Sequence, residues 1–290
     1  GLLLGRAFRL WRLNRDHSFD LMIAVMESAG FASVLASRDA IVANHCNPEE
    51  NFSRVEWWLA GRLFPRARKV VAVSKQGLAI FKKRLHLQNL QCIYNPVSEE
   101  SIRLAAAEPV EIPILSQCYM IAVGRLEQVK RFDRLLEAYA RSGVCDEIDL
   151  VILGQGGLYE SLQQKAAELG LSGHVIMPGY VSNPFPYIKQ ALFTVLSSDH
   201  EGFPMVLIES LCLGKPVIST NCPTGPGEII EDGRNGLLVP VNDTWALAAA
   251  IYHLVTDKAM YQSLAANAAA SVHHLRSEAI AGQWLALCKS

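Results

Sequence analysis

The sequence predicts an α/β fold with doubly wound parallel sheets, organised as two domains. Short β-branched runs alternate with helical patterns of about ten to fifteen residues, which is typical of parallel βαβ units. Several of these runs are apolar throughout instead of alternating, so helices should cover both faces of each sheet. A chain of 290 residues is long enough for two domains, each with its own hydrophobic core.

The expected elements follow in order along the chain. Strands are predicted at 21–26, 40–44, 69–74, 119–124, 149–154, 174–179, 192–198, 215–220 and 236–240. Helices are predicted near 51–64, 75–85, 130–142, 157–169, 204–213 and 242–256, with two or three more from 258 to 290. The segment 95–117 contains three prolines and several acids without a clear period, so we expect the interdomain linker there.

The distribution of charged residues and cysteines bears on possible partners and on disulfide or metal sites. Residues 1–110 carry 15 basic and 10 acidic side chains, whereas residues 111–290 carry 12 and 18. A basic first part suits anionic lipid, a phosphorylated substrate or nucleic acid, or it is only an uneven solvated surface. The seven cysteines are scattered without a CxxC pair, so neither a disulfide framework nor a zinc site is expected.

The first fifteen residues form an apolar helical pattern with an arginine at every third position from Arg6 to Arg15. Trp11 and several leucines accompany these arginines. The pattern favours a helix whose Leu/Phe/Trp face packs on a sheet, and a helix lying on a membrane surface is the alternative.

Two cations follow the predicted strand 119–124. Gly124 allows a close turn, and Arg125 and Lys130 would then lie near the start of the next helix. Ligands of parallel sheets bind at the carboxyl ends of the strands, and positive charge there suits phosphates. The alternative for each cation is a solvated side chain in a loop.

Three glycines follow the next strand. Gly154, Gly156 and Gly157 fit a phosphate cradle, but a plain β-to-α turn explains them equally well.

Two glutamates flank the start of the predicted helix 204–213. Glu201 lies in a turn before Pro204, and Glu209 lies inside the helix among Leu207, Ile208 and Leu211. A carboxylate in such apolar surroundings needs hydrogen-bond donors, and ribose hydroxyls would supply them. The alternative is that Glu209 caps or pairs with a neighbouring cation.

Ordered motifs now identify a family. The runs AVGRLEQVKRFDRLL, EGFPMVLIESLCLGKPVIS and GPGEIIEDGRNGLLVPVND resemble the nucleotide-sugar domain of retaining GT-B glycosyltransferases of family 4. The resemblance is continuous from about residue 119 to 256 and weaker in the first domain, at FDLMIAV, NHC, VVAVS and YNPV. It implies two Rossmann-like domains facing across a cleft, with boundaries at 1–112 and 113–270 and a helix over 271–290 that crosses back to the first domain. The family begins with a strand and a glycine-rich loop not seen before Gly1, so the first domain is expected to be incomplete.

The resemblance also implies roles for matching residues. Arg125 and Lys130 look like the ligands of the donor diphosphate, Glu209 like the ribose ligand, and Glu201 like the acid beside the donor sugar. His45 resembles the histidine that these enzymes place over the donor sugar, with a structural histidine as the alternative. The remaining donor-site candidates are Gly124, Gly154, Gly156, Gly202, Phe203, Pro204, Thr224 and Gly225. The last two belong to PTGPGEII, which resembles a variant in bacterial enzymes that add hexoses or N-acetylhexosamines to lipid-linked glycans; a plain proline-bounded loop is the alternative.

The expected activity is therefore transfer of a hexose or N-acetylhexosamine from a nucleotide sugar, UDP-linked by expectation, to a glycan or polyprenyl-linked acceptor. Alternatives are a non-catalytic nucleotide-sugar-binding subunit and a GT-B epimerase or phosphorylase. The chain has no DxD or HExxH motif, so we expect no metal site and no cofactor. We expect no nucleic-acid partner, and a cytoplasmic protein with peripheral contact at the inner face of the membrane through the basic first domain.

Overall fold

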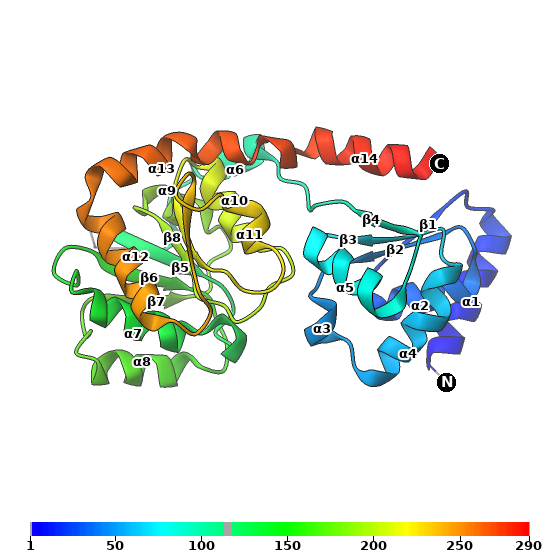
Figure 1. The fold of residues 1–290 in the computed structure, drawn as a ribbon, viewed down its shortest axis with the longest axis horizontal. Helices are drawn as coiled ribbons and strands as arrows, with labels where there is room; N and C mark the ends of the chain where they lie inside the picture. The colour runs from blue at the N-terminus through cyan, green and yellow to red at the C-terminus, as the bar shows by residue number, and fades with distance from the viewer. Residues whose placement is uncertain (1, 113–117, 290) are drawn as a thin grey trace. The chain divides into compact units, whose positions relative to one another are not determined.

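The computed structural model describes residues 2–112 and 118–289. It divides the chain into two compact units, each built on one parallel sheet (Figure 1). Unit 1 comprises Gly1–Pro96, Glu201–Phe203 and Glu278–Ser290, and unit 2 comprises Val97–His200 and Pro204–Ser277. This confirms the α/β class with parallel sheets that the sequence predicts.

Unit 1 has a four-stranded sheet in the order β1-β2-β3-β4. Its elements are α1 (Leu2–His17), β1 (Met22–Val25), α2 (Glu27–Ala36), β2 (Ala40–Asn44), α3 (Pro48–Asn51), α4 (Arg54–Leu63), β3 (Lys69–Ala72), α5 (Lys75–Leu85), β4 (Leu90–Cys92) and α14 (Ser277–Lys289). Alternate residues of the central strands face opposite sides. Val42 and Val70 join an aromatic cluster with Phe64 and Phe81.

The other face of this sheet is covered by α14. Ile41 and Val71 pack there with Ile280 and Leu287 of that helix. Both faces are thus buried, as the continuous apolar strands predict.

Helix α1 packs differently from the expectation. It lies mainly against α2, with only Leu3 reaching the cluster on the sheet face, and Ala7 is its one buried residue in the described part of the chain. Leu4, Phe8 and Trp11 are 68%, 61% and 44% exposed. The expectation that this Leu/Phe/Trp face packs on a sheet was therefore wrong. None of the helices within residues 2–112 and 118–289 combines the length and the apolar character needed to cross a membrane.

Unit 2 has a six-stranded sheet in the order β10-β9-β8-β5-β6-β7. Its elements are α6 (Glu99–Ala105), β5 (Tyr119–Val123), η2 (Gln128–Lys130), α7 (Phe132–Ser142), β6 (Asp149–Leu153), α8 (Tyr159–Glu168), β7 (Val175–Gly179), α9 (Phe185–Gln190), β8 (Thr194–Leu196), α10 (Met205–Cys212), β9 (Val217–Thr220), α11 (Pro226–Ile229), β10 (Gly236–Val239), α12 (Thr244–Thr256) and α13 (Lys258–Ser271). One face packs on α7, α8 and α12, and the other on α9 and the flank of α10.

The segment that we expected to be a linker is partly structured. Residues 99–105 form helix α6, which buries Ile102 and packs against α9 and α10. The Asn183 side chain donates to the Ala105 carbonyl oxygen at 2.9 Å. The boundary between the units therefore falls after Pro96, earlier than the expected 112/113. The rest of that linker, 113–117, lies outside the described residues.

Candidate functional site

The strand order of unit 2 locates its binding edge. From β5 the chain winds outward through β6 and β7, then returns to the other side of β5 to form β8, β9 and β10. The order reverses between β5 and β8, so their loops diverge at the carboxyl edge of the sheet. Open α/β sheets bind ligands at such a switch point.

The loop after β5 supplies two cations to this edge. Arg125 is 73% exposed, and its guanidinium contacts the Glu127 carboxylate at 2.8 Å. Lys130 ends the short η2 helix, and its side chain lies over Gly124. A Cβ added to Gly124 would come within 3.3 Å of Lys130 Cε. Gly124 therefore makes room for the lysine side chain.

The loop after β6 packs directly on the loop after β5. Gly154 has φ +149°, and a Cβ there would lie 1.8 Å from the Gly124 carbonyl oxygen. A Cβ on Gly156 would lie 2.5 Å from the Leu126 carbonyl oxygen. Gly157 has no atom within 4 Å of such a Cβ. Backbone packing thus accounts for Gly154 and Gly156 without any ligand.

Helix α10 follows β8 and carries Glu209. Burial raises the pKa of this carboxylic acid from its ordinary 4.5 to about 7. Among the described residues, no hydrogen-bond donor or cation pairs with this carboxylate. Pro204 occupies the N-cap position of this helix. The preceding residues, Glu201, Gly202 and Phe203, belong to unit 1.

The loop after β9 has an unusual backbone. Thr224 is buried with φ +62°, and Gly225 has φ +96°. The hydroxyl of Thr220 donates to the Ser198 carbonyl oxygen at 2.6 Å and joins this loop to the loop after β8. A threonine in the left-handed region is rare, and such strain often marks a functional segment.

His45 follows β2 in unit 1 and is half-buried. Burial lowers the pKa of His45, and a hydrogen bond with the Asn95 side chain partly opposes that effect. The imidazole is therefore favoured in its neutral form near pH 7.

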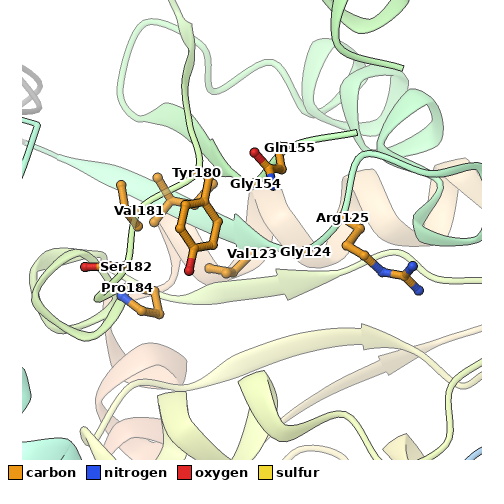
Figure 2. A pocket seen from close by; sticks show the side chains of 10 residues that line it. Val123, Gly124, Arg125, Gly154, Gln155, Tyr180, Val181, Ser182 and Pro184 are labelled. Atoms are coloured by element: carbon orange, nitrogen blue, oxygen red, sulfur yellow. The ribbon is translucent and has the colours of Figure 1, made fainter. Parts of the chain in front are cut away.

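The structure also shows a pocket lined in part by Tyr180 and Val181, two residues that the sequence did not indicate. It has a volume of about 500 Å³ and lies at the carboxyl ends of β5, β6 and β7. Figure 2 shows the Tyr180 ring beside Val181, with Arg125 at the opposite end. Tyr180 is 64% exposed. In the sequence this residue is only an aromatic one directly after a strand-ending glycine, and nothing there shows that its ring is exposed.

A second group of residues was missed at the switch point. The Asp199 carboxylate accepts from Arg131 at 3.1 Å and from Arg134 at 2.8 Å. The Asp199 backbone N–H donates to the Val129 carbonyl oxygen at 2.9 Å. An ion pair between residues 65 or more positions apart has no signature in a single sequence.

Unit 2 therefore brings together the loops that carry most candidates. The loops after β5, β6, β8 and β9 share one edge of its sheet. Hydrogen bonds join the loop after β8 to the loop after β5 and to the loop after β9. His45, Glu201, Gly202 and Phe203 lie in unit 1.

Two family models together cover most of the chain. The model described as Glycosyl transferases group 1 matches residues 111–271, and that described as Glycosyltransferase Family 4 matches residues 1–101.

Curated relatives are glycosyltransferases. The chain is 28% identical over 264 residues to the N-acetylgalactosamine-N,N'-diacetylbacillosaminyl-diphospho-undecaprenol 4-alpha-N-acetylgalactosaminyltransferase of Campylobacter jejuni, a match that covers 87% of this chain and 71% of the relative. It is 33% identical over 183 residues to the lipopolysaccharide core biosynthesis glycosyltransferase LpsE of Rhizobium meliloti, covering 63% and 51%. It is 34% identical over 165 residues to a lipopolysaccharide 1,6-galactosyltransferase of Salmonella typhimurium, covering 55% and 44%. The chain thus matches about half the length of the latter two relatives.

Solved structures share the fold. Anabaena Alr3699/HepE in complex with UDP superposes with a TM-score of 0.86 at 21% identity, covering 98% of this chain and 81% of that one. The lipopolysaccharide outer core galactosyltransferase WaaB superposes with a TM-score of 0.80 at 21% identity, covering 98% and 79%. These likenesses confirm the predicted GT-B fold. The matched family model spans more than half of the chain, so the chain belongs to the glycosyl transferases group 1 family and is a glycosyltransferase.

Proposed function

We propose that this protein is a retaining glycosyltransferase that moves a hexose or N-acetylhexosamine from a UDP-sugar to a glycan or lipid-linked glycan acceptor. The single observation that carries the proposal is the apolar environment of the Glu209 side chain. Its half-buried carboxylate, with a pKa raised to about 7, lies on the helix that follows β8 at the switch point. Holding a charge in such surroundings is costly, and hydrogen bonds from ribose hydroxyls would offset that cost.

The other proposed parts of the donor site lie at the same carboxyl edge of the unit 2 sheet. The pocket beside Tyr180 is large enough for a nucleobase, and an aromatic ring can stack on it. Arg125 and Lys130 would then bind the diphosphate from the neighbouring loop. Thr224 and Gly225 would line the donor pocket from the loop after β9.

The chemistry that we propose is electrostatic. In a retaining transfer the acceptor hydroxyl attacks from the face that the diphosphate leaves, so the main task is to stabilise the departing charge. Arg125 and Lys130 would do this as fixed cations, and we propose that the reaction needs no divalent metal. His45 and Glu201 are proposed beside the donor sugar on family resemblance alone.

The nature of the acceptor is proposed from relatives. The Campylobacter relative is named for an undecaprenol-linked acceptor, and the Rhizobium and Salmonella relatives for lipopolysaccharide. Such acceptors are held in membranes, which makes contact with a lipid surface part of the proposal.

Helix α1 supports that contact. Phe8 and Trp11 are exposed and stacked with ring centroids 5.8 Å apart, and the Arg15 guanidinium lies 5.1 Å from the Trp11 ring. Exposed aromatic residues with interleaved arginines favour anionic lipid headgroups. Vesicle flotation tests this: Trp11→Ala should lower binding to phosphatidylglycerol vesicles, and Trp245→Ala, an exposed tryptophan under Arg141 in unit 2, should not. Equal binding by both variants would remove α1 as the contact.

The donor site is tested by UDP binding and UDP release in the intact protein. Lys130→Ala and Glu209→Ala should each weaken UDP binding and lower UDP release by about tenfold or more. Lys258→Ala and Glu160→Ala change exposed side chains of the same types and should retain wild-type rates. Unchanged binding in the first pair would refute the assigned donor site.

The same assay separates the alternatives. Donor binding without turnover on any glycan acceptor would indicate a non-catalytic subunit. Conversion of the UDP-sugar without an acceptor, seen by product analysis, would indicate an epimerase, and phosphate-dependent products would indicate a phosphorylase. Turnover that falls on chelation with EDTA and returns with a divalent cation would contradict the metal-free mechanism.

A further inference from the structure

Lys130 lies in a segment that is held by its neighbour across the switch point. Its backbone carbonyl oxygen accepts from the Ser197 hydroxyl at 2.7 Å, and the carbonyl oxygen of Val129 accepts from the Asp199 N–H at 2.9 Å. Two successive carbonyl groups are therefore tied to the loop after β8. The position of the Lys130 backbone depends on that loop.

The side chain of Asp199 strengthens this connection. Its two oxygens are divided between Arg131, the residue after Lys130, and Arg134 in the first turn of α7. The Arg134 side chain is only 6% exposed, and it also donates to the Asn242 side chain from the loop after β10. A nearly buried guanidinium needs such partners, so removal of the Asp199 carboxylate would leave the Arg134 charge poorly compensated.

Arg131 has an unusual backbone that this ion pair helps to hold. It adopts φ +51°, in the left-handed region, between η2 and α7. Side-chain-bearing residues rarely adopt this conformation unless their surroundings enforce it. The turn at Arg131 follows the last residue of η2 directly, so its conformation affects the position of the Lys130 backbone from which the side chain extends.

We propose that Asp199 is a positioning residue for donor binding, which holds Lys130 in place through Arg131, Arg134 and the paired backbone hydrogen bonds. The inference rests on the proposed function, because it assigns Lys130 to the donor diphosphate. Asp199 itself does not touch the donor. A small displacement of a charged binding group is enough to weaken its interaction strongly.

The experiment is a double-mutant cycle on UDP affinity, measured by calorimetry well below the melting temperature. Asp199→Asn keeps the backbone N–H and the side-chain size but removes the charge, and it should raise the Kd for UDP by about tenfold. In a Lys130→Ala background the same change should raise the Kd by less than about twofold, because residues that act as one unit are not additive. An equal fold-change in both backgrounds would overturn the proposal.

Asp133→Asn is the matched control. Asp133 also pairs with Arg131, at 2.9 Å, but it lies on α7 and does not reach the loop after β8. It should change the Kd by less than about twofold. If Asp133→Asn raises the Kd as much as Asp199→Asn, the loss of an arginine partner explains the effect and the positioning role fails.

Ser197→Ala keeps the test decisive if Asp199→Asn does not fold. It removes one hydrogen bond to the Lys130 carbonyl oxygen, and it should raise the Kd about threefold in the wild-type background and leave it unchanged in Lys130→Ala. Failure of the proposed function is distinct: Lys130→Ala alone would then bind UDP normally. Loss of binding in Lys130→Ala with normal binding in Asp199→Asn would refute only the positioning role.

Discussion

The carboxylate of Glu209 should lower the stability of the ligand-free protein at neutral pH. The pKa of about 7 in the folded state, against the ordinary 4.5, corresponds to about 3 kcal/mol at roughly 1.4 kcal/mol per pH unit. Because the folded state binds this proton more tightly than the unfolded state, the contribution is absent below pH 4.5. Stability is lost as the pH rises from 4.5 through 7.

The perturbation is Glu209→Gln, which keeps the shape and stays neutral at every pH. At pH 8 the variant should be more stable than the wild type by up to about 3 kcal/mol, or about 5 to 10 °C in melting temperature. At pH 5 the difference should fall to about 1 kcal/mol, because the folded wild-type side chain is then protonated and only the unfolded chain has begun to ionise. The assay is thermal unfolding without nucleotide at pH 5, 6.5 and 8.

Glu160→Gln, an exposed residue of α8, should show no pH-dependent difference. A Glu209→Gln variant that is less stable than the wild type at pH 8, or a difference that stays constant from pH 5 to 8, would refute the reasoning. The same substitution should weaken UDP binding at pH 8 by about tenfold, since hydrogen bonds to an ionised carboxylate are the stronger ones.

Other predictions follow from packing and hydrogen bonding. Gly154→Ala forces a Cβ to 1.8 Å from a backbone carbonyl oxygen and should lower the free energy of unfolding, measured with denaturant, by about 3 kcal/mol or more. Gly157→Ala has open space and should lower it by less than about 1 kcal/mol. Equal losses in the two variants would contradict the packing argument. Asn235 is fully buried and makes hydrogen bonds of 2.9 to 3.0 Å through both side-chain atoms, so Asn235→Ala should cost about 2 to 3 kcal/mol, and a loss below about 0.5 kcal/mol would be inconsistent with it. Asn95→Ala should lower the pKa of His45 further in an NMR titration, because it removes the hydrogen bond that raises it, and an unchanged or higher pKa would disprove that bond.

Much of the fold was predictable because its strands are strongly apolar. Nine expected strands lie where the structure has strands, and burial of both sheet faces follows from their continuous hydrophobic runs. Strand β4 was missed because it has three half-buried residues with Gln91 in the middle. Helix α2 was missed as well; its Gly30, which weakens a helical pattern, fits closely against Val42, where a Cβ would come within 2.5 Å.

Candidate site residues could be recognised in the sequence only where a residue type conflicts with its surroundings. Glu209 stood out as an acid among leucines, and Arg125 and Lys130 as cations in the segment between a strand and the following helix. Asp199 carried no such conflict, because its partners come from a distant loop. Tyr180 was invisible for a related reason: its exposure is a property of the folded sheet edge.

The arrangement of α14 has a consequence for biosynthesis. Ile280 and Leu287 cover a sheet face formed by Ile41 and Val71, so this part of the first core can be completed only after residues 280–287 have been translated. Until then an apolar surface is open to chaperones or to aggregation. A polypeptide that stops before residue 278 would therefore leave this apolar sheet face uncovered and be prone to aggregation.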